Sequence, residues 1–203
     1  MFITLEGIDG CGKSTQAAIL NEKIAASTGK NVFGTREPGG WAQGGLIRSL
    51  LLEEDLYHPL SELFLFVIDR CEHVRQEIVP ALSRGDIVVC ERYSDSTRAY
   101  QIWGRGIPEE KVETLFSWCE FPEPDLTLWM DVPLEMAFAR IESSRSSLDR
   151  IESGTKSFLE RVCRGYEELA LRYPKRIVRI DGTQSLENVA NQIWNSLEVF
   201  LNQ

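Results

Sequence analysis

The sequence is poor in the residues that build metal centres and disulfide frameworks. It contains five cysteines and two histidines among 203 residues, and no two cysteines form a C-x-x-C pair. An odd number of scattered cysteines is typical of free thiols in a reducing compartment. We therefore expect a cytoplasmic protein that has neither a zinc site nor a secreted disulfide scaffold.

Long hydrophobic runs are also missing. No apolar segment approaches the length of about 18 residues that a membrane-spanning helix needs. The N-terminal residues do not show a basic region followed by an apolar stretch, which a secretory signal would have. The sequence therefore predicts no membrane partner and no secretion.

Positively charged residues are fewer than negatively charged residues. Lys and Arg number 22 against 31 Asp and Glu, which gives a formal net charge of −9. This balance argues against a nucleic-acid partner, because cations bind the phosphate backbone. A small anionic ligand remains compatible, since arginines can gather locally in a cleft. Without a repeat, a low-complexity tract or a linker, residues 1–203 are expected to form one domain.

The most informative feature that is present is a glycine-rich motif near the N-terminus. Residues 7–14 fit the phosphate-binding pattern G-x-x-x-x-G-K-[ST] and follow an apolar, strand-like run. Backbone N–H groups of such a loop and the N-terminus of the next helix favour an anion. Lys13 would reach the β- and γ-phosphates, and Ser14 would bind Mg²⁺. The residues expected to contact ATP here are Gly7, Ile8, Asp9, Gly10, Cys11, Gly12, Lys13, Ser14 and Thr15.

Strand-like and helical patterns alternate along the chain. The expected strands are 2–6, 31–35, 86–90, 125–131 and 176–181. The helical patterns lie near 14–27, 44–53, 59–84, 94–103, 108–120, 133–142, 157–173 and 186–201. This order predicts an α/β fold of the P-loop NTPase type, with a five-stranded parallel sheet, helices on both faces and a helical lid. Ligands of such folds bind at the carboxyl ends of the strands.

Charged residues follow two expected strands at that edge. Arg36 and Glu37 precede a Pro-Gly-Gly turn, where they would meet an anion or belong to a solvated turn. Glu91 ends another strand, as does the acid near a P-loop Mg²⁺, so Ser14 and Glu91 are the predicted metal ligands. Arg92 beside it would hold a phosphate bidentately, unless the two residues form only a strand-end ion pair.

Two helical patterns carry residues suited to a nucleobase. Phe66 and Arg70 are four residues apart and therefore share one helix face. The ring would stack on a base and the guanidinium would bond its edge, although an aromatic residue at this spacing is more often part of the core. Thr97 and Gln101 repeat the spacing, with Tyr100 between them.

A serine-interrupted stretch follows Arg140. Its arginines Arg140, Arg145 and Arg150 are five residues apart, so they do not share a helix face, and serine lowers helix propensity. We interpret residues 141–156 as a lid whose arginines neutralise charge on a transferring phosphoryl group. The alternative is an exposed connector with ordinary surface arginines.

Taken together, these motifs resemble those of the bacterial thymidylate kinases over essentially the whole chain. The most specific segments are Thr-Arg-Glu-Pro-Gly-Gly at 35–40, Asp-Arg at 69–70, Glu-Arg-Tyr at 91–93, Asp-Ser-Thr-Arg-Ala-Tyr-Gln at 95–101, Gly-Arg-Gly at 104–106 and Leu-Asp-Arg-Ile-Glu at 148–152. The resemblance implies transfer of the ATP γ-phosphoryl group to dTMP, with Mg²⁺, which gives dTDP and ADP. It also implies a homodimer.

The resemblance further implies the roles of individual residues. Phe66 would stack on thymine, Arg70 would contact its O4 edge, and Arg140 and Thr183 would lie at the adenine of ATP. The P-loop has no arginine, so the catalytic candidates are Lys13, Arg92, Arg145 and Arg150. The residues implied for the acceptor site are Asp9, Arg36, Glu37, Arg48, Phe66, Arg70, Arg92, Thr97, Tyr100 and Gln101.

One departure and one rival function stay open at this point. The family usually has Asp where this chain has Glu91, which adds one methylene to the reach toward the metal. The rival is a deoxynucleoside kinase that phosphorylates thymidine, in which Glu37 or Glu91 would accept the proton of the 5′-hydroxyl. Several arginines near the acceptor favour a substrate that already bears a phosphate.

Overall fold

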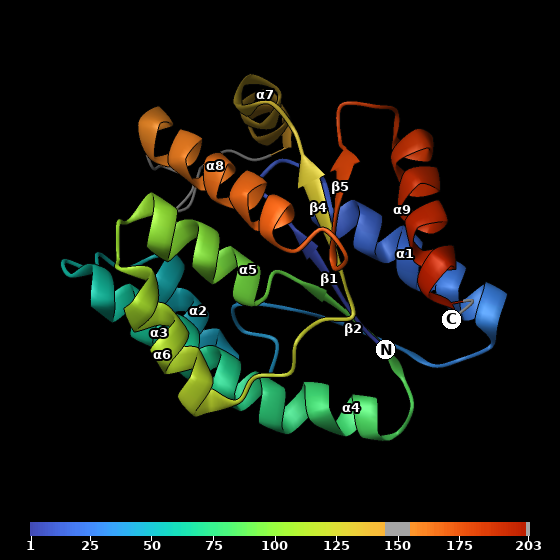
Figure 1. The fold of residues 1–203 in the computed structure, drawn as a ribbon, viewed down its shortest axis with the longest axis horizontal. Coiled ribbons are helices and arrows are strands. Elements are labelled where there is room, and N and C mark those ends of the chain that lie inside the picture. The colour runs from blue at the N-terminus through green and yellow to red at the C-terminus, as the bar shows by residue number, and fades with distance from the viewer. Residues whose placement is uncertain (145–154, 202–203) are drawn as a thin grey trace.

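The computed structural model describes residues 1–144 and 155–201, which Figure 1 shows as a sheet between two layers of helices. The five strands are parallel and lie in the order β2-β3-β1-β4-β5. Their bounds are β1 (Phe2–Glu6), β2 (Val32–Arg36), β3 (Ile87–Glu91), β4 (Leu126–Asp131) and β5 (Ile177–Asp181). The predicted five-stranded parallel sheet with helices on both faces is confirmed, and every strand begins and ends within one residue of its predicted bounds. Most of the predicted lid, residues 141–156, lies outside the residues that the structure describes.

The helical segments alternate with the strands as expected. They are α1 (Lys13–Thr28), α2 (Gly44–Leu52), α3 (Pro59–His73), η1 (Val74–Ile78), α4 (Val79–Ser83), α5 (Ser94–Thr97), η2 (Arg98–Gly104), α6 (Glu109–Cys119), α7 (Leu134–Ser144), α8 (Lys156–Arg172) and α9 (Leu186–Leu201). α1 and α9 pack together on one face of the sheet, and α5 and α8 lie on the other (Figure 1). None of the helices in the described ranges is long and apolar enough to cross a membrane.

The inner strands are almost wholly buried, which explains their continuous apolar character. β1 is buried at every position, and in β3 and β4 only the last residue is partly exposed. Parallel strands covered on both faces read as unbroken hydrophobic runs, as these do. The main core joins both helical layers, with Ile24 of α1 and Ile193 of α9 on one side and Val162 of α8 on the other.

Two of the predicted helices differ from the structure. The expected helix over 59–84 is α3 and α4 joined by the π-helical segment η1, and the expected helix over 94–103 is α5 followed by the π-helical η2. Pro80 at the start of α4 has no N–H to continue an α-helical ladder, which accounts for the wide turn before it. At the end of η2, the N–H of the next residue, Arg105, donates to the Tyr100 carbonyl at 2.9 Å, five residues back.

A close approach of η2 and α8 holds the second layer in place. A side chain at Gly104 would lie 2.7 Å from the Phe158 ring, and one at Gly165 would lie 3.1 Å from the backbone of Ala99. A side chain at Gly104 would therefore require the Phe158 ring to move, and one at Gly165 would crowd the backbone of Ala99. This contact fixes η2, and with it Tyr100 and Gln101, against the edge of the sheet.

Candidate active site

The loop between β1 and α1 has the strand–loop–helix setting that the motif requires. Gly7, Gly10 and Gly12 all have positive φ angles of 137°, 76° and 95°. A side chain at Gly7 would lie 2.6 Å from the Met130 carbonyl oxygen, and one at Gly10 would lie 2.4 Å from that of Ala137. The tight turn therefore depends on glycine, as in a phosphate-binding loop.

Lys13 lies buried beneath this loop. Its ammonium donates to the carbonyl oxygens of Gly7 at 3.1 Å and of Ile8 at 2.8 Å, and lies 3.8 Å from Asp9 Oδ1. These contacts hold the lysine across the loop. An ammonium in this position faces the concave side on which an anion would be held.

Ser14 and Glu91, the two predicted metal ligands, are brought together by the pairing of the strands. Ser14 Oγ donates to Glu91 Oε2 at 2.5 Å, although the residues are 77 positions apart. Hard oxygen donors of this kind suit Mg²⁺, which typically takes one or two protein ligands together with phosphates and water. Within residues 1–144 and 155–201, no three His, Cys, Asp or Glu side chains gather to hold a metal ion. A carboxylate–hydroxyl pair beside a phosphate-binding loop therefore fits Mg²⁺.

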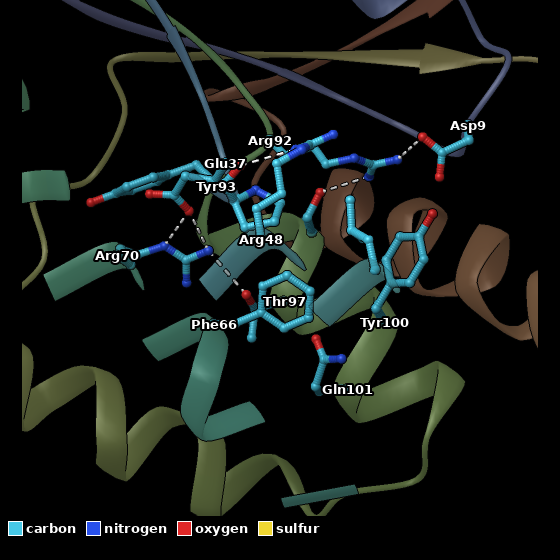
Figure 2. A pocket seen from close by; sticks show the side chains of 13 residues that line it. Asp9, Glu37, Arg48, Phe66, Arg70, Arg92, Tyr93, Thr97, Tyr100 and Gln101 are labelled. Carbon is cyan, nitrogen blue, oxygen red and sulfur yellow. Dashed lines mark hydrogen bonds and ion pairs between the residues drawn. The ribbon is translucent and has the colours of Figure 1, made fainter. Parts of the chain in front are cut away.

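Two adjoining hollows lie at the carboxyl edge of the sheet. The P-loop hollow is lined by Asp9, Gly10, Gly12, Lys13, Ser14, Thr15, Arg36, Glu37, Arg48, Glu91, Arg92, Arg140 and Ile141. The aromatic hollow, which Figure 2 shows, is lined by Asp9, Glu37, Pro38, Arg48, Leu52, Phe66, Arg70, Arg92, Tyr93, Ser96, Thr97, Tyr100 and Gln101. Asp9, Glu37, Arg48 and Arg92 belong to both, so the two hollows meet at these four charged side chains.

Arg70 is buried in the wall of the aromatic hollow. Its Nε donates to Glu37 Oε2 at 2.8 Å and its Nη2 to Thr97 Oγ1 at 3.0 Å (Figure 2). Burial opposes its charge, but Glu37 more than offsets this and holds the pKa of Arg70 above its ordinary value. Its Nη1 has no hydrogen-bond partner. The fixed guanidinium therefore presents one spare donor.

Unpartnered polar atoms gather around this hollow. Six buried side-chain atoms in the described ranges have no hydrogen-bond partner, and four of them belong to its lining residues. These four are Arg70 Nη1, Tyr93 Oη, Tyr100 Oη and Gln101 Oε1. Because buried polar groups are normally satisfied, their concentration here indicates a polar ligand. Figure 2 shows the ring of Phe66 between Arg70, Tyr100 and Gln101, where it offers an apolar plate, whereas the hydroxyl of Tyr93 points away from it.

Arg92 stands where the two hollows meet. Its backbone adopts a left-handed conformation, with φ 64°, which is uncommon and strained for a residue other than glycine. Its Nη2 donates to Asp9 Oδ1 at 2.8 Å and its Nη1 to Ser96 Oγ at 3.1 Å. Burial opposes the charge, but Asp9 more than offsets it, so the pKa of Arg92 lies well above its ordinary value. The guanidinium therefore stays charged.

Behind Arg92 lies an acid that the sequence analysis did not single out. Glu6 is fully buried and accepts hydrogen bonds from Tyr93 N–H at 2.8 Å, from Ser96 Oγ and from Tyr166 Oη at 3.3 Å. Burial, and next the nearby Asp95, raise the pKa of Glu6 to about 7. A charged residue at the end of an otherwise apolar strand was the available signal.

The remaining predicted residues are placed as follows. Arg48 donates to the Pro38 carbonyl at 3.0 Å and lines both hollows, whereas exposed Arg36 lines the P-loop hollow and not the aromatic hollow. Arg140 donates to the Gly182 carbonyl at 2.9 Å. Thr183 donates to Asp181 at 2.6 Å. A further hollow beside the P-loop is lined by Cys11, Gly12, Thr15, Gln16, Met130, Arg140, Gly182, Gln184, Leu186 and Val189.

Some residues of the site were missed, and others lie outside the described ranges. Pro38, Leu52, Tyr93 and Ser96 line the aromatic hollow without having been predicted as site residues. Tyr93 and Ser96 lie inside the motifs at 91–93 and 95–101, so their neighbours were the available signal. Arg145 and Arg150, the predicted lid arginines, fall outside the residues that the structure describes.

Comparisons with known proteins agree on one family. The family model described as thymidylate kinase matches residues 5–193. The thymidylate kinase of Synechococcus sp. (strain JA-2-3B'a(2-13)) is 45% identical over 98% of this chain and 94% of its own length. That of Alkalilimnicola ehrlichii is 44% identical over 97% and 91%. The crystal structure of the thymidylate kinase from Ehrlichia chaffeensis is 34% identical, superposes with a TM-score of 0.80, and the match covers 98% of each chain.

Proposed function

The chain belongs to the thymidylate kinase family and is a kinase that phosphorylates dTMP, and on that premise we propose how its residues perform the transfer. The triphosphate of ATP lies on the P-loop, and dTMP lies in the aromatic hollow. The γ-phosphoryl group passes from ATP to the phosphate of dTMP, which gives ADP and dTDP.

The observation that carries this proposal is the meeting of the two hollows at Asp9, Glu37, Arg48 and Arg92. A phosphate-binding loop on one side and an aromatic-lined hollow on the other suit a triphosphate and a nucleotide base. The two arginines at the junction suit the acceptor phosphate and the group in transfer. Holding both reactants in this alignment supplies much of the rate enhancement of phosphoryl transfer.

The wall of the aromatic hollow suits a pyrimidine with carbonyl and N–H groups. Arg70 Nη1 is a spare donor for a base carbonyl, and Gln101 Oε1 is a spare acceptor for a base N–H. Phe66 would stack on the base. Thr97, whose hydroxyl accepts a hydrogen bond from Arg70, would line the same base. Tyr100, which lies beneath the Arg92 guanidinium at 5.3 Å, would support the sugar or the phosphate.

The chemistry needs charge stabilisation rather than a general base. A phosphate oxygen of dTMP is already ionised at neutral pH and can attack directly. Lys13 would stabilise the β- and γ-phosphates, and Arg92 and Arg48 would orient the acceptor phosphate. Arg145 and Arg150 are assigned to the transferring group on the family likeness alone. Arg140 and the Gly182–Gln184 loop are assigned to the adenine side.

The pair of Ser14 and Glu91 would hold Mg²⁺. When bound, the ion neutralises charge on the β- and γ-phosphates. The chain's own part is to keep the hydroxyl and the carboxylate together at the start of α1 and the end of β3.

The contacts of the carboxylates weigh against the rival thymidine kinase. A 5′-hydroxyl substrate needs a carboxylate to take its proton. Glu37 is buried between Arg70 and His73, with His73 Nδ1 3.0 Å from its Oε1, and Glu91 accepts from Ser14. Asp9 is paired with Arg92. Each candidate base is thus already engaged by a donor.

A side-by-side assay tests the proposal. Purified protein is given ATP and Mg²⁺ with either dTMP or thymidine, and ADP release is followed. We expect turnover with dTMP and only background turnover with thymidine or without an acceptor. Faster turnover with thymidine would replace the proposal by the rival kinase, and equal turnover without an acceptor would indicate a simple ATPase.

We also propose that the chain forms the homodimer implied by its family. Large apolar side chains are exposed on α2 and α3, which pack against each other. They are Leu46, Leu50, Phe64 and Ile68. Exposed apolar patches of this kind suit association with a second copy. Light scattering should give twice the chain mass, and a monomer that persists at high concentration would contradict this.

A further inference from the structure

Two cysteine side chains from different helices lie in contact, away from both hollows. Cys71 Sγ donates to Cys119 Sγ at 3.6 Å, although the residues are 48 positions apart. Cys71 belongs to α3 and Cys119 is the last residue of α6, and these helices pack against each other (Figure 1). Both side chains are partly exposed, so a small oxidant can reach them. The phosphoryl transfer proposed above uses neither thiol.

The surroundings make this pair different from the other cysteines. Both residues pack against one apolar cluster that includes Val67 of α3 and Phe116 of α6, so their helices are held in register. Cys119 ends its helix, and the next residue, Glu120, has a left-handed backbone with φ 49°. A residue at a helix end moves more freely than one inside it, which helps two sulfurs to approach the S–S bond length of about 2.05 Å.

We propose that Cys71 and Cys119 are a modification site, at which a peroxide joins α3 to α6 through an intrachain disulfide. The thiolate of Cys119 attacks one oxygen of hydrogen peroxide, the O–O bond breaks, and a sulfenic acid and water form. The sulfur of Cys71 then attacks the sulfenic sulfur, and the S–O bond breaks as a second water leaves. In total, two thiols and one peroxide give one disulfide and two waters.

The order of these steps follows from the setting of Cys71. Burial, and next the hydrogen bond with Cys119, raise the pKa of the Cys71 thiol to about 12. Cys71 is therefore almost fully protonated at neutral pH and is a poor first nucleophile. It suits the second step, in which its proton leaves with the water.

The disulfide would act on the aromatic hollow. Cys71 follows Asp69 and Arg70 directly, and Phe66 lies on the same helix. Asp69 accepts from Gly39 N–H at 3.0 Å and from Trp41 Nε1 at 2.8 Å, so α3 also holds the turn after β2. A crosslink that shifts α3 against α6 therefore moves the residues proposed to bind the base, and leaves the P-loop in place.

Peptide mapping tests the modification site. The full-length protein is treated with hydrogen peroxide, alkylated without reduction and digested. We expect a peptide linking Cys71 to Cys119, a mass lower by two hydrogens, and three alkylated thiols instead of the five present in the sequence. The crosslink should raise the thermal midpoint by on the order of 5–10 °C, and a reductant should reverse this.

Matched variants and a binding measurement complete the test. Cys71→Ser should abolish the crosslink and Cys163→Ser should retain it. Five alkylated thiols after oxidation, or a linked peptide that joins two chains, would overturn the modification site. Calorimetry with dTMP should show a change in affinity on the order of fivefold or more on oxidation, with ATP unaffected. A crosslinked protein that binds dTMP as before would overturn the coupling to α3. Only the dTMP measurement rests on the proposed function. Unchanged dTMP binding by a crosslinked protein is therefore distinguishable from a failure of the disulfide to form.

Discussion

The Nη2 atom of Arg92 lies 2.8 Å from Oδ1 of Asp9, a residue of the P-loop 83 positions earlier in the chain. This ion pair stands at the junction of the P-loop hollow and the aromatic hollow. It links the residues proposed to bind the donor to those proposed to bind the acceptor. The strained backbone of Arg92, with φ 64°, is the local arrangement that places its guanidinium there.

Replacing Arg92 tests this junction. Arg92→Ala removes a charge that we assign to the acceptor phosphate and the transition state, so we expect kcat/KM for dTMP to fall by on the order of 10³-fold. Arg92→Lys keeps the charge but loses the fork that reaches both Asp9 and Ser96, and should recover only part of the activity. Steady-state kinetics of both variants check this. Full activity of the lysine variant would show that a point charge is enough.

Lys13→Ala should abolish turnover and retain the fold. The ammonium lies under the P-loop, and its loss removes stabilisation of the β- and γ-phosphates, which we expect to lower kcat by on the order of 10³-fold or more. Circular dichroism should be unchanged. Lys30→Ala, at an exposed position outside the site, is the control. A folded Lys13→Ala protein with near-normal turnover would contradict the assignment.

Phe66→Ala should weaken dTMP binding selectively. The ring is a wall of the aromatic hollow and does not line the P-loop hollow. Loss of base stacking should raise KM for dTMP on the order of tenfold or more, with KM for ATP nearly unchanged. Trp118→Ala, a change at an exposed aromatic residue of α6 that lines neither hollow, is the control for dTMP binding. An equal rise in KM for dTMP and for ATP would mean that Phe66 supports the fold rather than contacts the base.

Arg70→Met should destabilise the fold. The change leaves Glu37 buried with one fewer partner, and breaking a buried pair in this way typically lowers the free energy of unfolding by about 3–5 kcal/mol. Urea unfolding measures it, and the double change Arg70→Met with Glu37→Gln should restore part of the loss. Arg84→Met, which removes the exposed arginine of an ion pair with Asp86, should lower the free energy of unfolding by no more than about 1 kcal/mol. A similarly small loss for Arg70→Met would contradict the role of the buried pair.

Glu6 should make stability depend on pH. Its folded-state pKa of about 7 lies above its ordinary value of 4.5, so the folded protein binds the proton more tightly than the unfolded chain does. The contribution of Glu6 to the free energy of unfolding is fully present below about pH 4.5 and is lost as the pH rises through 7. The total loss is up to about 3 kcal/mol. Glu6→Gln should therefore flatten the fall in the free energy of unfolding between pH 5 and 8.

Urea unfolding of both proteins at several pH values checks this. Glu135→Gln, a change at an exposed carboxylate whose pKa is lowered by local hydrogen bonds, should leave the slope in that window unchanged. Parallel slopes for the wild type and Glu6→Gln would show that Glu6 does not hold a proton near neutral pH.

The fold and the phosphate-binding half of the site could be predicted because their signals are local. Apolar runs mark buried parallel strands, and the glycine loop is one uninterrupted motif. Phe66 and Arg70 were suggested as a base-binding pair by their spacing, and Arg48 could be assigned only through resemblance. Nothing near these residues in the sequence shows that they meet Asp9 and Arg92. Their convergence depends on strand order and helix packing.

The π-helical segments and Glu6 could not be predicted for a different reason. A π turn depends on tertiary contacts more than on residue type, and only Pro80 gave a local hint. The pKa of Glu6 depends on complete burial and on Asp95, which a sequence alone does not reveal. Sequence patterns therefore indicate the helices and strands but not the details of their packing.

The π-helical segments η1 and η2 have a consequence for chain length. One directly follows α3, which carries Phe66 and Arg70, and the other carries Tyr100 and Gln101. Each π turn contains one residue more than an α-helical turn does. A single-residue deletion there would tighten the turn while its flanking helices persist. The spacing of the residues in these two segments therefore contributes to the breadth of the aromatic hollow, and variants shorter by one residue there would accommodate bases of different size.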